Sequence, residues 1–238
     1  MRKRLETRGV PRNPAPLYAA SGWESTPGLS PDGNQVAYSW REESDPAAHI
    51  YVKLIGEGRP VRLTTGPRSD EGPVWSPDGH TIAFLRDLDS VRAIYIIPAI
   101  GGAERKIAEG GFVSRKIGWS PDGRFLAVGE REPQTTAASV SLISVANGDR
   151  VVLTKPPNAK TDDSDPIFSP DGHRLLFTRR SGVMHGALYL LDLADGYRAL
   201  GNPRLLRQER GAIDGALGRR TAARLSTRWE KAPPGSTG

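Results

Sequence analysis

The chain has 238 residues, 37% of them hydrophobic and 25% charged, which is an ordinary composition for a soluble globular protein. It contains no cysteine, and this excludes disulfides, thiol nucleophiles and cysteine-bound metals. The formal net charge of +6 comes entirely from residues 198–238, which carry nine basic and three acidic side chains, so residues 1–197 offer nucleic acid no general electrostatic attraction.

The first 20 residues are rich in arginine and proline, and we expect them to form a linker. Residues 1–4 have the basic character of the first region of a signal peptide, but no apolar run follows them. No window reaches the roughly 20 apolar residues that a transmembrane helix requires. We therefore expect a chain with neither an export signal nor a membrane segment, which by default would stay in the cytoplasm.

The tetrapeptide Ser-Pro-Asp-Gly occurs four times, at spacings of 46, 44 and 49 residues. Each copy follows a bulky apolar residue and precedes an apolar triplet, a pattern that predicts a strand, a tight turn and a second strand. The proline fixes φ, the Asp carboxylate accepts a backbone N–H two residues on, and the glycine adopts a positive φ. The structural turn residues are Asp32, Gly33, Asp78, Gly79, Asp122, Gly123, Asp171 and Gly172.

Two further β-rich stretches follow in every repeat. The third strand is predicted at residues 50–52, 94–96, 140–142 and 188–190, and the fourth at residues 61–64, 105–107, 151–154 and 204–206. Four strands in about 45 residues form one blade of a β-propeller. No substantial helix is expected before residue 207. We therefore predict an all-β fold, a partial β-propeller of about four four-stranded blades over residues 21–207.

The repeated Trp/Phe-Ser-Pro-Asp-Gly unit resembles the TolB-like, WD-related β-propeller repeat over about residues 20–207. More narrowly, residues 50–56 with 62–64, and residues 95–102, resemble propeller segments of bacterial winged-helix regulators and membrane-anchored Ser/Thr kinases. The resemblance implies a family that closes with six or more blades, a sensory or interaction role, and a periplasmic location.

The repeat pattern stops after Arg207. Residues 211–216 resemble the approach to a fifth repeat, but no Ser-Pro-Asp-Gly follows and the chain becomes rich in arginine and alanine. We expect residues 208–238 to be a basic tail that is either disordered or the product of a frameshift. A nucleic-acid-binding arm is the alternative, but the tail lacks aromatic residues apart from Trp229. An open arc of blades would also favour self-association through its edges.

Several repeated side chains have two interpretations. The turn aspartates could bind a metal, but their position in the turn favours a structural role. Trp40 lies outside the repeat positions and is a candidate for a surface contact. The histidines lack ligand spacing, so we expect surface positions, no metal site and no cofactor; they are His49, His80, His173 and His185. Aromatic residues at fixed repeat positions favour inter-blade core over ligand stacking; they are Tyr51, Trp75, Tyr95, Trp119, Phe168 and Tyr189.

Four carboxylates precede the turn serines by about six residues, where the innermost strand of a blade begins. They are Glu24, Asp70, Glu71 and Asp163. If the blades pack as expected, these side chains converge at one mouth of the central channel and form a binding site for a cationic peptide or a metal. The alternative is that they are solvated loop acids.

No catalytic residue is predicted. An α/β-hydrolase requires a Gly-x-Ser-x-Gly elbow followed by an acid and a histidine, and the sequence contains no such elbow, its last histidine being His185. The sequence therefore favours a non-catalytic propeller that recognises a protein, peptide or ligand, as the sensory part of a truncated bacterial regulator. The alternative is the accessory propeller of a prolyl-oligopeptidase-like hydrolase without its catalytic domain.

Overall fold

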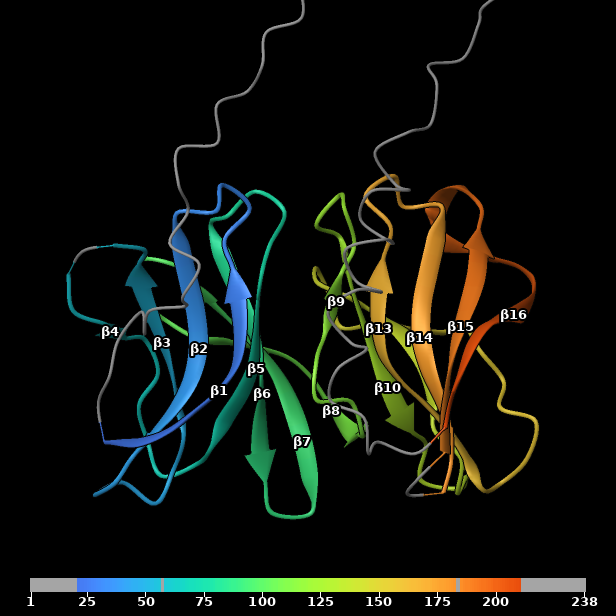
Figure 1. Cartoon of the computed structure of the whole chain (residues 1–238), viewed down its shortest axis with the longest axis horizontal. Helices are drawn as coiled ribbons and strands as arrows, with labels where there is room; N and C mark the ends of the chain where they lie inside the picture. Colours follow the sequence, from blue (N-terminus) through green and yellow to red (C-terminus); the bar gives the residue numbers. More distant parts are fainter. Residues whose placement is uncertain (1–20, 57, 183–184, 211–238) are drawn as a thin grey trace, which may run out of the picture.

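The computed structural model describes residues 21–56, 58–182 and 185–210, and gives no side-chain placement for residues 207–210. The predicted linker and most of the predicted tail lie outside this range. The described chain is all-β, as the repeats predict, with a single 3-10 turn at Asp195–Tyr197 (Figure 1). No helix in the described part of the chain is long and apolar enough to cross a membrane.

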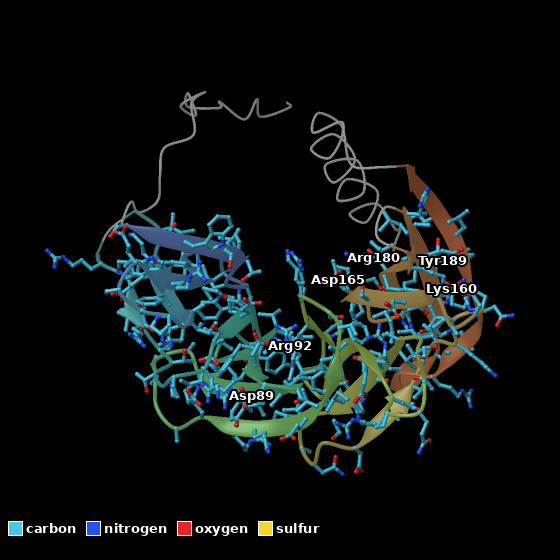
Figure 2. All side chains as sticks on the ribbon, turned by 90° about the horizontal axis from the view of Figure 1, so that it is seen from below. Asp89, Arg92, Lys160, Asp165, Arg180 and Tyr189 are labelled. Carbon is cyan, nitrogen blue, oxygen red and sulfur yellow. The ribbon has the colours of Figure 1, made fainter. Side chains whose placement is uncertain are left out.

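The strands pair antiparallel in three sheets, the middle one spanning two repeats, so that four blades follow the chain; Figure 2 shows them in order along an arc. Blade 1 holds β1 (Gly22–Leu29), β2 (Gln35–Glu42), β3 (His49–Leu54) and β4 (Val61–Arg62). Blade 2 holds β5 (Asp70–Trp75), β6 (Thr81–Leu88), β7 (Val91–Pro98) and β8 (Arg105–Phe112). Blade 3 holds β9 (Gly118–Trp119), β10 (Phe125–Arg131), β11 (Ser139–Ser144) and β12 (Arg150–Val152). Blade 4 holds β13 (Thr161–Phe168), β14 (Arg174–Ser181), β15 (His185–Leu193) and β16 (Ala199–Arg210).

Blade 3 departs from the regular pattern at its inner strand. The end of β8 pairs with β10, so blades 2 and 3 share one continuous sheet, and β9 is only two residues long. A glycine permits this approach, since a Cβ on Gly111 would lie 2.4 Å from the Arg131 carbonyl oxygen. Beyond β8, the Gly129 N–H donates to Ser114 Oγ at 2.7 Å, so a side chain replaces a backbone ladder bond.

The core lies between neighbouring blades. Alternate residues of the middle strands face the adjacent blade, as the period of a strand requires. The three inter-blade clusters centre on Ile50 and Phe84, on Leu85 and Leu126, and on Leu142 and Phe177. Each of these side chains is at most 1% exposed, and burying one stabilises the fold by roughly 1.5–3 kcal/mol.

The Ser-Pro-Asp-Gly turns have the same hydrogen bonds in all four blades. The serine hydroxyl donates to the aspartate at 2.5–2.7 Å. The aspartate accepts the backbone N–H two residues on at 3.0–3.1 Å. The glycines have φ of 72–74°, in the left-handed region that L residues with a Cβ rarely adopt. The serine hydrogen bond, followed by the backbone hydrogen bond, lowers the pKa of Asp32, Asp78 and Asp171.

The aromatic residues at repeat positions lie in the core, with one difference. Trp75, Tyr95, Trp119, Phe168 and Tyr189 belong to or pack against the inter-blade clusters. Tyr51 instead lies in a cluster within blade 1, together with Val36, Tyr38 and Trp40. Its hydroxyl donates to Glu42 at 2.5 Å, and burial together with this carboxylate raises the pKa of Tyr51 to about 12.

Two surface predictions were wrong. Trp40 is only 9% exposed, because its ring packs 4.8 Å from the ring of Tyr51. His49 is 1% exposed, and its Nε2 lies 3.2 Å from Asp45 Oδ2. Burial lowers the pKa of His49, with the Arg62 charge acting in the same direction and Asp45 opposing them. The other three histidines are exposed.

Candidate functional site

The innermost strands of three blades carry a β-bulge whose residue has positive φ. These residues are Thr26 (49°), Gly72 (63°) and Asp165 (53°). A positive φ at a residue with a side chain is strained and persists only when the surroundings fix it. Here the bulge links neighbouring blades, because Thr26 Oγ1 accepts the Gly72 N–H at 3.2 Å and Asp165 Oδ1 accepts the Arg115 N–H at 3.0 Å.

The structure gives the four predicted channel-mouth carboxylates two different environments. Asp70 and Asp163 have fully buried side chains and pair with arginines of their own blades rather than with each other. Glu71 is 44% exposed and lies 3.4 Å from Arg92, and Glu24 is exposed on β1. Whether these carboxylates bind a partner stays a prediction.

Each buried aspartate is held by an arginine on the next strand. Arg86 donates from Nε and Nη2 to Asp70 at 2.6 and 2.8 Å, and Arg179 donates to Asp163 over the same two distances. Hydrogen bonding to the aspartate raises the pKa of both arginines, against the effect of burial. Burial raises the pKa of the Asp70 carboxyl, opposed by hydrogen bonds from Arg86 and Thr64.

Both guanidinium groups also stack on aromatic rings. The Arg86 carbon Cζ lies 4.5 Å from the centre of the Tyr95 ring, and that of Arg179 lies 4.6 Å from the centre of the Tyr189 ring. In each blade a second ring, Phe84 or Phe177, packs beside the tyrosine ring, and the guanidinium carbon lies 5.4 Å from the centre of Phe84 and 5.6 Å from that of Phe177. Sequence reasoning missed this arrangement. Its signal is an arginine two residues after the phenylalanine of the apolar triplet, together with an aspartate six residues before the turn serine.

A groove of about 750 Å³ lies between the β6–β7 turn of blade 2 and the loop that joins β10 to β11 in blade 3. We call it the polar groove, and Figure 2 labels two of its residues, Asp89 and Arg92, in the middle of the arc. Its charged lining comprises Arg68, Asp87, Asp89, Arg92, Arg131 and Glu132.

Ion pairs hold the arginines of the polar groove in place. Arg92 donates to Asp87 and to the Ser114 carbonyl oxygen, both at 2.8 Å. Arg68 forms a two-point ion pair with Asp89 across the groove edge. The carboxylates remain open to solvent, since the side chain of Asp87 is 50% exposed and that of Asp89 is 73% exposed. The groove therefore presents positioned donors beside accessible acceptors, which suits a polar ligand with both kinds of group.

The described residues contain no cluster of three or more histidine, aspartate and glutamate side chains that would hold a metal ion. The buried acids are instead satisfied by arginines and serve the packing of the blades. The charged residues that line the polar groove offer hydrogen bonds and charge pairing to a ligand.

Part of the chain is similar in sequence to a larger bacterial protein. The uncharacterized peptidase YuxL of Bacillus subtilis is 30% identical in an alignment 191 positions long, and the match covers 64% of this chain and 29% of YuxL. The chain thus spans less than a third of that relative's length.

Solved structures share the fold. The putative TolB of Agrobacterium tumefaciens is 25% identical with a TM-score of 0.66, and the match covers 80% of this chain and 69% of that one. A puromycin-hydrolyzing peptidase of Mycobacterium tuberculosis is 18% identical with a TM-score of 0.61, covering 81% and 30% of the two chains. A family model described as the TolB beta propeller domain, PD40, matches residues 12–201. The repeats, the blades and this match agree, and the chain belongs to the TolB β-propeller domain family.

Proposed function

We propose that the chain is a non-catalytic β-propeller module that recognises a protein or peptide partner through the polar groove. The observation that supports the proposal best is the alternation of held arginines with solvent-exposed carboxylates at Asp87 and Asp89. Binding residues are commonly carried on loops that a rigid scaffold positions, and here two blades in one continuous sheet provide the scaffold.

Two of the four carboxylates predicted at the channel mouth are accessible to a partner, and two are buried. Glu71 adjoins the polar groove through Arg92, and Glu24 is exposed, so both are available to a cationic partner. Asp70 and Asp163 have fully buried side chains, each paired with an arginine that is only 13% exposed, so a partner in solvent cannot reach them as it can reach the exposed carboxylates of Asp87 and Asp89. We therefore place the recognition of positive charge on Glu71, Asp87 and Asp89.

The test is selection from a random peptide library displayed on beads, followed by fluorescence polarisation with the selected peptides. Arg92→Gln removes the charge that organises Asp87 and Glu71, and we expect it to weaken binding by about tenfold or more. Arg198→Gln, an exposed arginine outside the groove lining, is the matched control and should bind like the wild type. Equal binding by Arg92→Gln and the wild type would remove the polar groove as the recognition surface.

A second candidate is the accessory propeller of a prolyl-oligopeptidase-like hydrolase. The 30% identity to YuxL, a protein named as a peptidase, favours it. In that case the propeller would select substrates for a catalytic domain and would not itself cleave them. Reading the gene beyond both ends of the chain distinguishes the candidates, because a Gly-x-Ser-x-Gly elbow in a flanking α/β-hydrolase frame supports the peptidase.

A third, narrower version makes the propeller the sensory part of a regulator or kinase, as residues 50–56 and 95–102 suggested by resemblance. The relatives described above are named as a peptidase and as TolB, so this version rests on those segments alone. A winged-helix or kinase frame beside the gene supports it, and a hydrolase frame contradicts it.

A further inference from the structure

Blades 2 and 4 each place an arginine against a buried aspartate and a tyrosine ring. In blade 2 this arginine also binds a second carboxylate. In blade 2, Glu104 receives a second two-point hydrogen bond, from Arg86 Nη1 at 2.6 Å and from Nη2 at 3.0 Å. The guanidinium of Arg86 is therefore bracketed by two carboxylates. Among the side chains that the structure places, which exclude those of residues 207–210, Asp163 is the only carboxylate that accepts from Arg179.

The strand register explains the difference. The stacked tyrosine pairs with Lys106 in blade 2 and with Leu205 in blade 4. Two residues before these partners stand Glu104 and Pro203 respectively. Proline has no carboxylate, so at this position blade 4 offers Arg179 no counterpart of Glu104.

A pocket of about 320 Å³ in blade 4 is lined by Arg179, by the stacked Tyr189 and by its strand partner Leu205. We call it the blade 4 pocket; its lining includes Asn158, Thr161, Arg179, His185, Tyr189 and Leu205. Asn158 Oδ1 accepts hydrogen bonds from the Lys160 N–H and from Thr161 Oγ1, so the Asn158 amide nitrogen is left as a donor. Figure 2 labels Lys160 and Tyr189 in the same part of blade 4.

We propose that the blade 4 pocket binds a carboxylate, which takes the place that the Glu104 carboxylate takes in blade 2. The ligand class is a peptide with an acidic side chain or with a free C-terminal carboxylate. Arginine offers five donors in a rigid fork that matches a carboxylate, and Asp163 uses only Nε and Nη2. This inference goes beyond the proposed function, because the pocket is distinct from the polar groove.

The geometry reduces the entropic cost of binding. The Arg179 side chain is only 13% exposed, is fixed by two hydrogen bonds to Asp163, and stacks on the Tyr189 ring. A ligand therefore does not have to order a mobile arginine, which otherwise costs affinity. Blade 2 provides the internal precedent, since its guanidinium accommodates two carboxylates at once.

The test uses three short peptides and the arginine side-chain Nε–Hε signals in an NMR titration. Acetyl-Gly-Glu-Gly-amide offers a side-chain carboxylate, acetyl-Gly-Gly-Gly offers a terminal one, and acetyl-Gly-Gln-Gly-amide offers none. We expect a saturable shift of the Arg179 signal with at least one carboxylate peptide and none with the glutamine peptide. The peptide that binds identifies the source of the carboxylate. The same response to all three peptides, or to none, would overturn the proposal.

A matched pair of variants tests the position itself. Pro203→Glu supplies the missing carboxylate from within the chain, and we expect it to weaken peptide binding by about tenfold or more, whereas Pro203→Gln has the same size without the charge and should bind like the wild type. Conversely, Glu104→Gln should open a second site at Arg86. Equal binding by Pro203→Glu and Pro203→Gln would contradict the proposal. Arg92→Gln should leave this binding unchanged, which separates the pocket from the polar groove.

Discussion

Ser120 and Asp122 hold the third Ser-Pro-Asp-Gly turn closed through a 2.7 Å hydrogen bond from the serine hydroxyl to the carboxylate. The same hydroxyl accepts the Phe125 backbone N–H at 2.9 Å, and the carboxylate accepts the Arg124 N–H at 3.1 Å. A two-residue side-chain network thus satisfies the backbone between two strands. The same serine–aspartate hydrogen bond recurs in every blade, and removing it should lower the free energy of unfolding.

Asp122 should make the fold sensitive to acid. Burial alone would raise its pKa, but hydrogen bonds from Ser120 and Arg124 lower the pKa to about 2, below the ordinary value of 3.8. A carboxyl whose pKa is depressed by folding stabilises the protein above pH 3.8 and loses this contribution as the pH falls toward about 2. We expect a loss of roughly 1 kcal/mol after allowance for solvent screening. Urea unfolding of Asp122→Asn should show a smaller fall over this pH range than the wild type, and equal falls would contradict the assignment.

Ser120→Ala should lower the free energy of unfolding by about 1–2 kcal/mol. The substitution removes one donor and one acceptor from a 0% exposed position, leaving the Phe125 N–H without its side-chain partner. Chemical denaturation at pH 7 measures the effect. Ser44→Ala, in an exposed loop, is the control and should change stability by less than about 0.5 kcal/mol. A Ser120→Ala variant as stable as the control would show that the hydroxyl does not support the turn.

Arg86→Met should destabilise the chain strongly, because it leaves the fully buried Asp70 without a counter-charge. Breaking a buried ion pair by removing one partner typically costs about 3–5 kcal/mol. The double variant Arg86→Met with Asp70→Asn should recover part of the loss, since the uncompensated charge is gone. Arg92→Gln, whose carboxylate partners are about half exposed, should cost less than about 1 kcal/mol. Thermal unfolding of the four proteins checks the order, and a mild Arg86→Met would contradict the structural role of the pair.

The outer face of blade 4 should promote self-association. Ile167 and Leu200 are 56% and 51% exposed on this face, whereas Val74, which takes the place of Ile167 in blade 2, packs into the core between blades. Apolar blade faces of this kind are buried when another blade covers them. Analytical ultracentrifugation should show concentration-dependent association that Ile167→Thr weakens, while Val151→Thr on the short strand β12 serves as a control. A monomer at every concentration would rule the association out.

The repeats predicted the blades because turn chemistry and strand period are local properties. A proline, an aspartate and a glycine in fixed order specify the hairpin, and the apolar triplets specify the faces that pack. The shared sheet of blades 2 and 3 was not predictable in this way, since it depends on how closely Gly111 approaches Arg131.

The candidate site was less predictable than the fold. The sequence located Asp70 and Asp163 on the inner strands, but not the arginines 16 residues later that pair with them, because such pairing requires the register between strands. Trp40 was misplaced for a related reason. Trp40 pairs with Glu24 across the strands of blade 1, at the position where Arg86 pairs with Asp70 in blade 2. The Trp40 ring therefore packs on Tyr51 where blade 2 has a guanidinium over Tyr95.

Recognition through the polar groove is tested most directly by hydrogen–deuterium exchange mass spectrometry of the chain with and without a selected peptide. We expect slower exchange at residues 87–92 and 131–135, which line the groove from two blades, and an intact peptide after incubation. Protection confined to other blades, or cleavage of the peptide, would contradict it.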